Sequence, residues 1–341
     1  MLLREVQPVV PGAQPLSLEE IRDPLPGDYE LLVQVEACGV CHTELDEIEG
    51  RTPPPSLPVI PGHQVVGTVV ETGRYATRFA PGQRVGIAWI NSACGYCEYC
   101  RSGRENLCAE FKATGRDING GYAELMTVGE DFAYPIPEQF SPLEAAPLLC
   151  AGAVGYRALM LARPENGQNL GLIGFGASAH LVLKLVVHQY PDTKVFVFAR
   201  NESERHFAAE LGAHWTGDPD EVPPEQLHCA IDTTPVWGPV IHGLNNLAPG
   251  GRLVINAIRK EAQDREVLAD LDYPSHLWME KELTTVANVT RNDVTAFLSL
   301  AAGVPIRPEV QLFRLEEAND ALVQLKAKRV RGAKVLNLMG R

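Results

Sequence analysis

The sequence is short of basic residues. Lys and Arg number 30 against 43 Asp and Glu, which gives a formal net charge of −13. A polyanionic surface repels phosphate backbones and anionic lipids, so we expect neither a nucleic acid nor a membrane as partner. No basic segment followed by an apolar run opens the chain, and no window reads as the roughly 20 apolar residues of a membrane span. The sequence therefore predicts a cytoplasmic protein.

Internal repeats and low-complexity segments are also missing, and 341 residues exceed what one hydrophobic core usually serves. Short apolar runs between Pro and Gly make residues 1–150 β-rich. Beyond Cys150, strands alternate with helices, which favours a parallel sheet. The expected strands there are 169–174, 194–198, 229–232, 252–256 and 283–288, with helices at 177–190 and 202–211. The last three of these strands are expected to be buried.

The end of the chain, from about residue 313 to 338, contains a helix and a strand but no second Gly-rich turn. We expect it to return to the first domain. The predicted boundaries are 1–151 with 290–341 for one domain and 152–289 for the other.

Eight cysteines are present, and half of them crowd into one loop. The four are Cys94, Cys97, Cys100 and Cys108. Four thiolates at this spacing close a tetrahedral shell around zinc with no open position, which is typical of a structural site. An iron–sulfur cluster uses other spacings, reactive thiols are a further alternative, and a nucleic-acid-binding zinc ribbon conflicts with the acidic charge balance.

Three further metal-ligand candidates are scattered. Cys41 follows a predicted strand, His63 follows Pro61-Gly62, and Cys150 lies at the domain boundary. Two thiolates and one imidazole would leave a fourth zinc position for substrate. Taken singly, these residues have other readings, since Cys38 and Cys41 could form a redox pair and a lone cysteine is usually a small buried hydrophobe.

A Gly-rich turn follows the strand at 169–174 and opens a helix. Its pattern, G-x-G-x-x-A at 174–179, is a variant of the dinucleotide fingerprint. Gly174 makes the tight turn, Gly176 admits the pyrophosphate, and Ala179 allows close packing of helix on strand. The helix dipole favours the phosphate charge at this end.

The end of the next strand bears on the choice between NAD and NADP. NAD-binding proteins place an Asp or Glu there for the ribose 2′-hydroxyl. This chain has Ala199 followed by Arg200, which favours NADP(H) over NAD(H), with Arg200 stacked on adenine or pointing to solvent as the alternative.

Several motifs together resemble the zinc-containing medium-chain alcohol dehydrogenases, in the cinnamyl-alcohol-dehydrogenase-like branch. They are C-G-V-C-H-T at 38–43, P-G-H at 61–63, the four-cysteine loop, G-G-Y-A-E at 120–124 and L-L-C-A-G at 148–152. The resemblance implies an α/β protein with a GroES-like β-rich catalytic domain and a Rossmann doubly wound cofactor domain. It implies Cys41, His63 and Cys150 as catalytic-zinc ligands, Thr43 as the hydroxyl that takes the substrate proton, and His42 as a pyrophosphate contact.

Two positions depart from the family pattern. Gln64 stands where the family usually has Glu, which changes the charge near the metal but removes no ligand. Asp46 stands where the family often has a His that passes the proton to solvent; it is a candidate relay or a solvated loop residue. Trp89 and Ile90 resemble a pocket-lining run of microbial ethanol-type enzymes, with a core role for Trp89 as the alternative.

The expected function is a zinc-dependent alcohol dehydrogenase or aldehyde reductase acting on a primary alcohol, with two zinc ions per subunit. The alternatives are a zinc polyol or secondary-alcohol dehydrogenase, a zinc-free quinone or enoyl reductase, and a non-catalytic zinc-stabilised binding protein. The resemblance also implies a homodimer or homotetramer, with 283–288 as the strand that pairs across a dimer.

Overall fold

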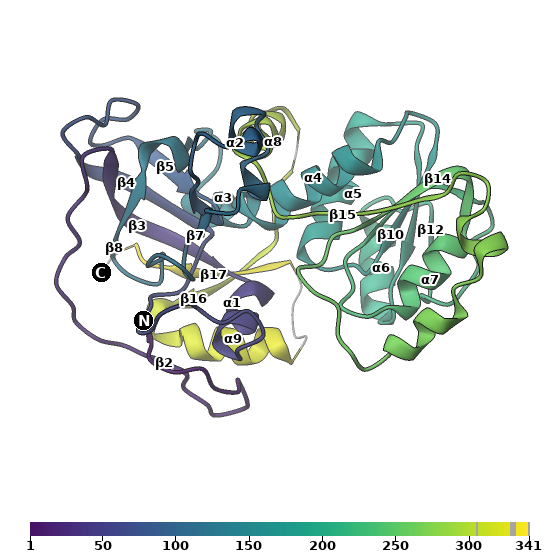
Figure 1. The fold of residues 1–341 in the computed structure, drawn as a ribbon, viewed down its shortest axis with the longest axis horizontal. Coiled ribbons are helices and arrows are strands. Elements are labelled where there is room, and N and C mark those ends of the chain that lie inside the picture. The colour runs from purple at the N-terminus through teal and green to yellow at the C-terminus, as the bar shows by residue number, and fades with distance from the viewer. Residues whose placement is uncertain (305, 328–331, 340–341) are drawn as a thin grey trace. The chain divides into compact units, whose positions relative to one another are not determined.

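The computed structural model describes residues 1–304, 306–327 and 332–339. They divide into two compact units (Figure 1). Unit 1 comprises Met1–Cys150, Val289–Ala302 and Arg307–Arg341, and unit 2 comprises Ala151–Asn288 and Gly303–Ile306. The two main divisions lie one residue before the boundaries that the sequence suggested.

Unit 1 is built on a seven-stranded sheet in the order β16-β17-β3-β4-β5-β9, with β8 also paired to β3. All neighbours are antiparallel except β16 and β17. The strands of this sheet are β3 (Glu30–Val40), β4 (Val65–Thr72), β5 (Arg84–Ile87), β8 (Leu125–Gly129), β9 (Ala133–Pro135), β16 (Val310–Arg314) and β17 (Ala333–Asn337). β3 is eleven residues long and mostly buried, and it lies inside the sheet between β17 and β4.

Shorter elements surround that sheet. The strands are β1 (Leu2–Leu3), β2 (Leu16–Ser17), β6 (Ile90–Ser92) and β7 (Lys112–Ala113). The helices are α1 (His42–Ile48), α2 (Glu98–Arg101), α3 (Pro142–Ala145), α8 (Arg291–Gly303) and α9 (Ala318–Lys326), with 3-10 turns η1 (Glu105–Leu107), η2 (Glu130–Phe132), η3 (Ala146–Leu149) and η6 (Leu315–Glu317). The unit is thus β-rich, as the GroES-like expectation required.

Unit 2 contains one parallel sheet in the order β12-β11-β10-β13-β14-β15. Its strands are β10 (Asn169–Ile173), β11 (Lys194–Phe198), β12 (Trp215–Gly217), β13 (Leu227–Asp232), β14 (Leu247–Ile255) and β15 (Glu282–Thr285). Its helices are α4 (Ala151–Ala162), α5 (Ala177–Gln189), α6 (Glu202–Glu210) and α7 (Gly238–Asn245), with turns η4 (Arg265–Asp270) and η5 (Tyr273–Leu277). The strand order reverses between β10 and β13, which confirms the doubly wound Rossmann architecture.

One predicted strand differs in its environment. Residues 283–288 were expected to form a buried strand, but β15 begins one residue earlier, ends at Thr285 and is largely exposed. The prediction of burial is wrong because β15 is the last strand in the sheet order and pairs only with β14 in the described chain.

The expectation that no segment is apolar enough to cross a membrane is wrong by composition. The helical run Pro142–Ala162 has a hydropathy of 1.5 over its most apolar window. However, 61% of that window is buried, and a helix in a protein core passes the same test. Within unit 1, α3 packs on β3 and β4, and within unit 2, α4 packs on α5, β13 and β14.

Candidate active site

The three scattered ligand candidates meet in unit 1. The ligand atoms of Cys41, His63 and Cys150 all lie within 4.8 Å of one another. The Sγ of Cys41 is 3.7 Å from the Nε2 of His63. A sulfur and a nitrogen on one tetrahedral zinc are about 3.6 Å apart, given ordinary bond lengths. These residues therefore fit a zinc ion with one position left for substrate.

The register of two antiparallel strands brings these residues together. In the β3–β4 ladder, Cys38 lies opposite Val65, and the N–H of Gly39 donates to the carbonyl of Gln64 at 2.9 Å. Continued outward, this register places Val40 opposite His63, so Cys41 follows one residue beyond that pair. Cys150 follows the η3 turn, so it reaches the cluster from another part of unit 1.

A carboxylate that the sequence analysis missed stands behind His63. The Oε1 of Glu44 lies 2.6 Å from the Nδ1 of His63, and both side chains are almost completely buried. Burial alone would lower the pKa of His63, but Glu44 and Cys41 raise it well above its ordinary value. Metal-ligating histidines usually present their second nitrogen to such a partner, which fixes the ring. Glu44 therefore aims Nε2 at the two thiols.

A local signal for Glu44 was present in the sequence. Cys41 is the N-cap of α1, and its backbone N–H donates to the Oε2 of Glu44 at 2.9 Å. The Sγ of Cys41 in turn accepts from the amide of Thr43 at 3.3 Å. An acidic residue three positions after a cap forms such a reciprocal box. The same carboxylate thus binds the cap and His63.

The other predicted residues of this region have different surroundings. Thr43 is half-buried one residue after the exposed His42. Asp46 is buried, and its Oδ1 accepts from the Nε of Arg51 at 2.5 Å. Its carboxylate is therefore paired, and its relay role stays a prediction.

Gln64 and the tryptophan run lie in packed surroundings. Gln64 is buried, and its side chain covers Gly39, where an added Cβ would come within 2.7 Å of the amide carbon. Trp89 and Ile90 are both buried in the core of unit 1, and the Trp89 ring is 5.2 Å from that of Phe111. The core position of Trp89 matches the alternative reading, while contact with substrate stays a prediction for both residues.

The four cysteines of the loop also converge. The ligand atoms of Cys94, Cys97, Cys100 and Cys108 lie within 4.8 Å of one another. The Sγ atoms of Cys94 and Cys100 are 3.8 Å apart, which equals the edge of about 3.8 Å expected for a tetrahedral zinc–thiolate shell. Backbone amides also donate to the sulfurs: that of Cys97 to Cys94 and that of Cys100 to Cys97, both at 3.4 Å. This donor set fits a closed tetrathiolate zinc site.

In unit 2, the Gly-rich turn has the form that a pyrophosphate needs. Gly174 has a φ of +82°, and an added Cβ would lie 2.7 Å from the Oγ1 of Thr233. Gly176 faces open space and is the N-cap of α5, with no side-chain cap among the described residues. Ala179 is buried on α5. The open N-terminus of this helix fits a dinucleotide phosphate.

Beyond β11, Ala199 is buried and Arg200 is exposed. Arg205 was missed by the sequence analysis. Its Nη1 donates to the carbonyls of Ala199 and Arg200 at 2.7 and 3.1 Å, so it fixes the backbone that presents Arg200.

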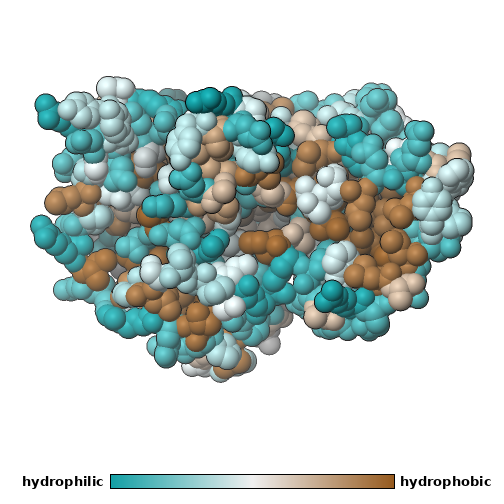
Figure 2. Space-filling view, viewed as in Figure 1, coloured by the Kyte–Doolittle hydropathy of each residue, from teal (hydrophilic) through white to brown (hydrophobic). Residues whose placement is uncertain are grey.

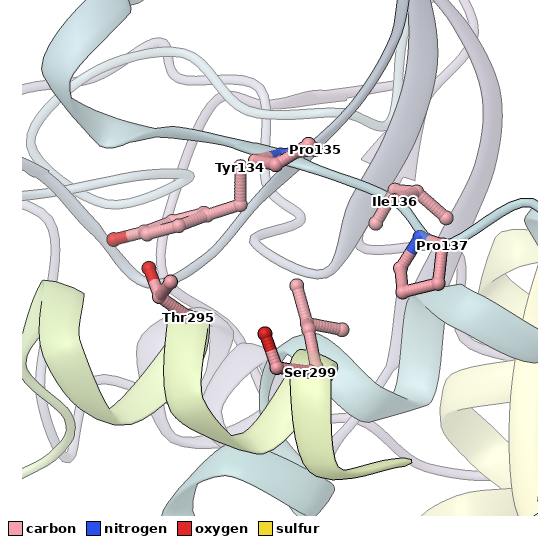
Figure 3. Close-up of a pocket in the computed structure, with 7 residues that line it drawn as sticks. Tyr134, Pro135, Ile136, Pro137, Thr295 and Ser299 are labelled. Atoms are coloured by element: carbon pink, nitrogen blue, oxygen red, sulfur yellow. The ribbon is translucent and has the colours of Figure 1, made fainter. Parts of the chain in front are cut away.

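A separate cavity of about 250 Å³ lies in unit 1 between β9 and α8 (Figure 3). In the close-up, the hydroxyl of Tyr134 points toward Thr295 on α8, and Pro135, Ile136 and Pro137 follow Tyr134 along the same segment. None of the predicted site residues lines it.

Comparison with known proteins agrees with this geometry. Residues 27–138 match the alcohol dehydrogenase GroES-like domain family. The probable alcohol dehydrogenase AdhA of Mycobacterium tuberculosis is 42% identical over 327 residues, which cover 94% of this chain and 92% of that protein. This chain belongs to the zinc-type medium-chain alcohol dehydrogenases. An alcohol dehydrogenase of Geobacillus stearothermophilus is 32% identical over 95% of this chain and 96% of its own.

The branch follows from a solved structure. A cinnamyl alcohol dehydrogenase of Sorghum bicolor superposes with a TM-score of 0.81 at 26% identity, covering 94% of this chain and 93% of the other. The chain is thus an NAD(P)-dependent alcohol dehydrogenase of the cinnamyl-alcohol-dehydrogenase-like branch, as the sequence motifs implied.

Proposed function

We propose that this alcohol dehydrogenase binds two zinc ions per subunit and interconverts a primary alcohol and its aldehyde with NADP(H). The observation that carries the proposal is the Cys41, His63 and Cys150 cluster, whose donor atoms lie within 4.8 Å of one another. The tetracysteine loop supplies the second site. Both sites use thiolates, which favours a reducing, cytoplasmic compartment.

The residues of the site have distinct tasks. Bound zinc supplies a Lewis acid, and bound nicotinamide accepts or donates a hydride. Glu44 keeps the imidazole of His63 oriented toward the metal position. Thr43 is half-buried two residues after Cys41, and its hydroxyl would accept the alcohol proton during oxidation while passing its own proton on toward solvent.

The two sites should differ in lability. The tetrathiolate shell is closed, whereas the Cys41 site has an open position that a chelator can attack. Stepwise treatment with a chelator should abolish alcohol oxidation before circular dichroism reports unfolding. Loss of activity only in parallel with unfolding would contradict the assignment of a separate, open catalytic site.

The cofactor preference rests on the end of β11. Ala199 removes the acid that would bind the ribose 2′-hydroxyl and repel a 2′-phosphate, and exposed Arg200 offers a planar donor fork. A charge-assisted hydrogen bond to phosphate contributes about 1.5–3 kcal/mol, or roughly ten- to a hundred-fold in preference. Arg205 supports this arrangement because it binds the carbonyls on both residues.

The test compares kcat/KM for NADPH and NADH in the wild type and in Arg200→Ala. The wild type should prefer NADPH, and the variant should lose most of that preference. Arg163→Ala is the control. Arg163 is an exposed arginine that precedes β10, at the amino ends of the strands, so its removal should leave the preference unchanged. A wild-type preference for NADH, or an unchanged preference in Arg200→Ala, would overturn the proposal.

The substrate class follows from the resemblance of the Trp89–Ile90 run to ethanol-type enzymes. A panel of primary alcohols, secondary alcohols and polyols should give the highest kcat/KM with a primary alcohol. Higher values with sorbitol-like polyols or with secondary alcohols would favour the alternative dehydrogenases.

The proposed assembly is a homodimer or homotetramer in which β15 pairs with a second copy. The outer edge of β15 pairs with no other strand of the described chain, and Leu283 on it is 44% exposed. Figure 2 shows hydrophobic residues gathered on one face of unit 2. Light scattering should give a dimer or tetramer for the wild type and a smaller species for Leu283→Arg. A monomeric wild type would refute this assembly.

A further inference from the structure

A buried lysine in unit 2 has every one of its donors in use. The side chain of Lys260 is 8% exposed, and its Nζ contacts the Oδ2 of Asp232, which is fully buried. The same Nζ donates to the carbonyl of Thr234 at 2.8 Å and to that of Val236 at 2.9 Å. An ammonium group has three hydrogens, so no donor remains for a ligand. The role of Lys260 is therefore to hold other residues of the chain in place rather than to bind a ligand directly.

Lys260 connects two loops at one edge of the sheet. Asp232 is the last residue of β13, and Lys260 follows the end of β14 at Ile255. Both loops therefore leave the carboxyl ends of neighbouring parallel strands. The amide of Glu261 adds a hydrogen bond to the carbonyl of Pro235 at 2.6 Å.

The same two loops are joined again at the start of α7. The Oδ2 of Asp264 accepts from the amides of Trp237 and Gly238 at 2.7 and 2.8 Å. The segment after β14 thus holds residues 233–238 at both ends.

The fixed loop also touches the Gly-rich turn. Thr233 donates to the carbonyl of Ile173 from its amide at 2.8 Å and from its hydroxyl at 3.1 Å. Gly174, the next residue, has no room for a Cβ because the Oγ1 of Thr233 is in the way. This loop therefore packs directly against the phosphate-binding turn and forms the wall beside it.

The strand order indicates which half of the cofactor meets this wall. In a doubly wound sheet, a dinucleotide lies across the carboxyl edge at the point where the order reverses, with one mononucleotide on each half. Here that point lies between β10 and β13. The adenosine half belongs to the side of β11, where Ala199 and Arg200 lie, and the nicotinamide half belongs to the side of β13 and β14.

We propose that Lys260 is a positioning residue for the nicotinamide half of the cofactor. Its ammonium group clamps the 233–237 loop to the segment after β14, so that the backbone facing the nicotinamide half is already in place before the cofactor binds. Asp232 balances the charge of the lysine, so that neither buried charge is left unpaired.

The variant must separate positioning from stability. Lys260→Met alone leaves the Asp232 carboxylate buried and unpaired, which destabilises the fold. The double variant Lys260→Met/Asp232→Asn removes both charges together. The amide oxygen of Asn at 232 can still accept from the amide and hydroxyl of Thr234, as Oδ1 does now at 3.1 and 2.7 Å. The contact between Nζ and Oδ2 and the hydrogen bonds to the carbonyls of Thr234 and Val236 are lost together.

The experiment is a titration of the zinc-loaded enzyme with two pairs of ligands. NADH and NADPH contain the nicotinamide half, while AMP and adenosine 2′,5′-bisphosphate contain only the adenosine half. The double variant should bind NADH and NADPH about ten-fold more weakly, because one misplaced hydrogen bond corresponds to roughly that factor. Its affinity for the two adenosine ligands should stay within two-fold of the wild type.

A matched control is a second lysine of unit 2 that donates to two backbone carbonyls but lies at the amino end of a strand. The Nζ of Lys281, just before β15, donates to the carbonyls of Leu244 and Ser275 at 2.9 and 2.8 Å. Lys281→Met should lower the melting temperature and leave all four affinities unchanged. Lys260→Gln/Asp232→Asn, in which the Gln amide can still donate to two carbonyls and no charge is left buried, is the second variant if the first double variant does not fold. It should show a smaller loss with the same dependence on ligand.

Two outcomes would overturn the proposal. Equal weakening of all four ligands would assign Lys260 to the general stability of unit 2. Unchanged affinity for NADH and NADPH would show that the clamp does not position the cofactor.

Discussion

The carboxylate behind His63 offers a sharp perturbation of the catalytic metal site. In Glu44→Gln, the amide has one acceptor oxygen where the carboxylate has two. The oxygen can accept from the Cys41 amide, as Oε2 does now at 2.9 Å, or face the Nδ1 of His63, as Oε1 does now at 2.6 Å. If the oxygen accepts from the Cys41 amide, the NH₂ group faces His63. If the oxygen faces His63, the NH₂ group faces the Cys41 amide. In the first case His63 loses its acceptor, and in the second the N–H of Cys41, which is both the N-cap of α1 and a zinc ligand, loses its acceptor, so a zinc ligand is disturbed either way.

The expected loss of zinc affinity can be estimated from what a carboxylate partner contributes to a metal-ligating histidine. Loss of a carboxylate behind a ligating histidine lowers metal affinity or activity about ten- to a hundred-fold, or roughly 1.4–2.7 kcal/mol. Competition with a chromophoric chelator measures zinc affinity at both sites of one protein. We expect Glu44→Gln to weaken only the labile zinc, with the tetrathiolate zinc as an internal control. Equal affinity of wild type and variant at the labile site would refute the role given to Glu44.

Four further predictions concern unit 1, one in the four-cysteine loop and three on α1. Cys100→Ser should lower the melting temperature while any folded fraction keeps its cofactor affinity, because a structural zinc contributes folding energy; an unchanged melting temperature would contradict the tetrathiolate site. Thr43→Val should lower kcat for alcohol oxidation about a hundred-fold or more, and Asp46→Asn should lower it mainly at low pH. An unaltered pH profile in Asp46→Asn would limit that carboxylate to pairing with Arg51. Burial, followed by the charge of Glu44, raises the pKa of Glu47 from 4.5 to about 8. The folded state then retains a proton that the unfolded chain loses, so wild-type stability should fall between pH 4.5 and about 8 relative to Glu47→Gln; parallel urea-unfolding profiles for the two proteins would contradict this.

Features that are local in sequence could be predicted. The four-cysteine loop lies within fifteen residues. Its tight turns are held by hydrogen bonds between near neighbours, such as that from the Cys97 amide to the Cys94 sulfur. The Gly-rich turn and the strand before it were similarly readable, because the G-x-G-x-x-A pattern encodes both the turn and the start of α5.

Features that depend on strand register or strand order could not be predicted. Glu44 is a visible capping residue of α1, but its contact with His63 exists only because β3 and β4 pair in one register. Lys260 and Asp232 are 28 residues apart, and only the parallel pairing of β13 with β14 brings them to one edge. The exposure of β15 has the same origin, since a strand of unchanged sequence is buried or open according to its place in the sheet.

The central claim is that two different metal sites exist in each subunit, one of them catalytic. Elemental analysis combined with activity measurement, on the wild type and on Cys150→Ser, tests it most directly. Two zinc ions per wild-type chain, with one zinc and no alcohol oxidation in the folded Cys150→Ser variant, is the predicted result. Fewer than two metal ions per wild-type chain, or full activity in Cys150→Ser, would contradict the account.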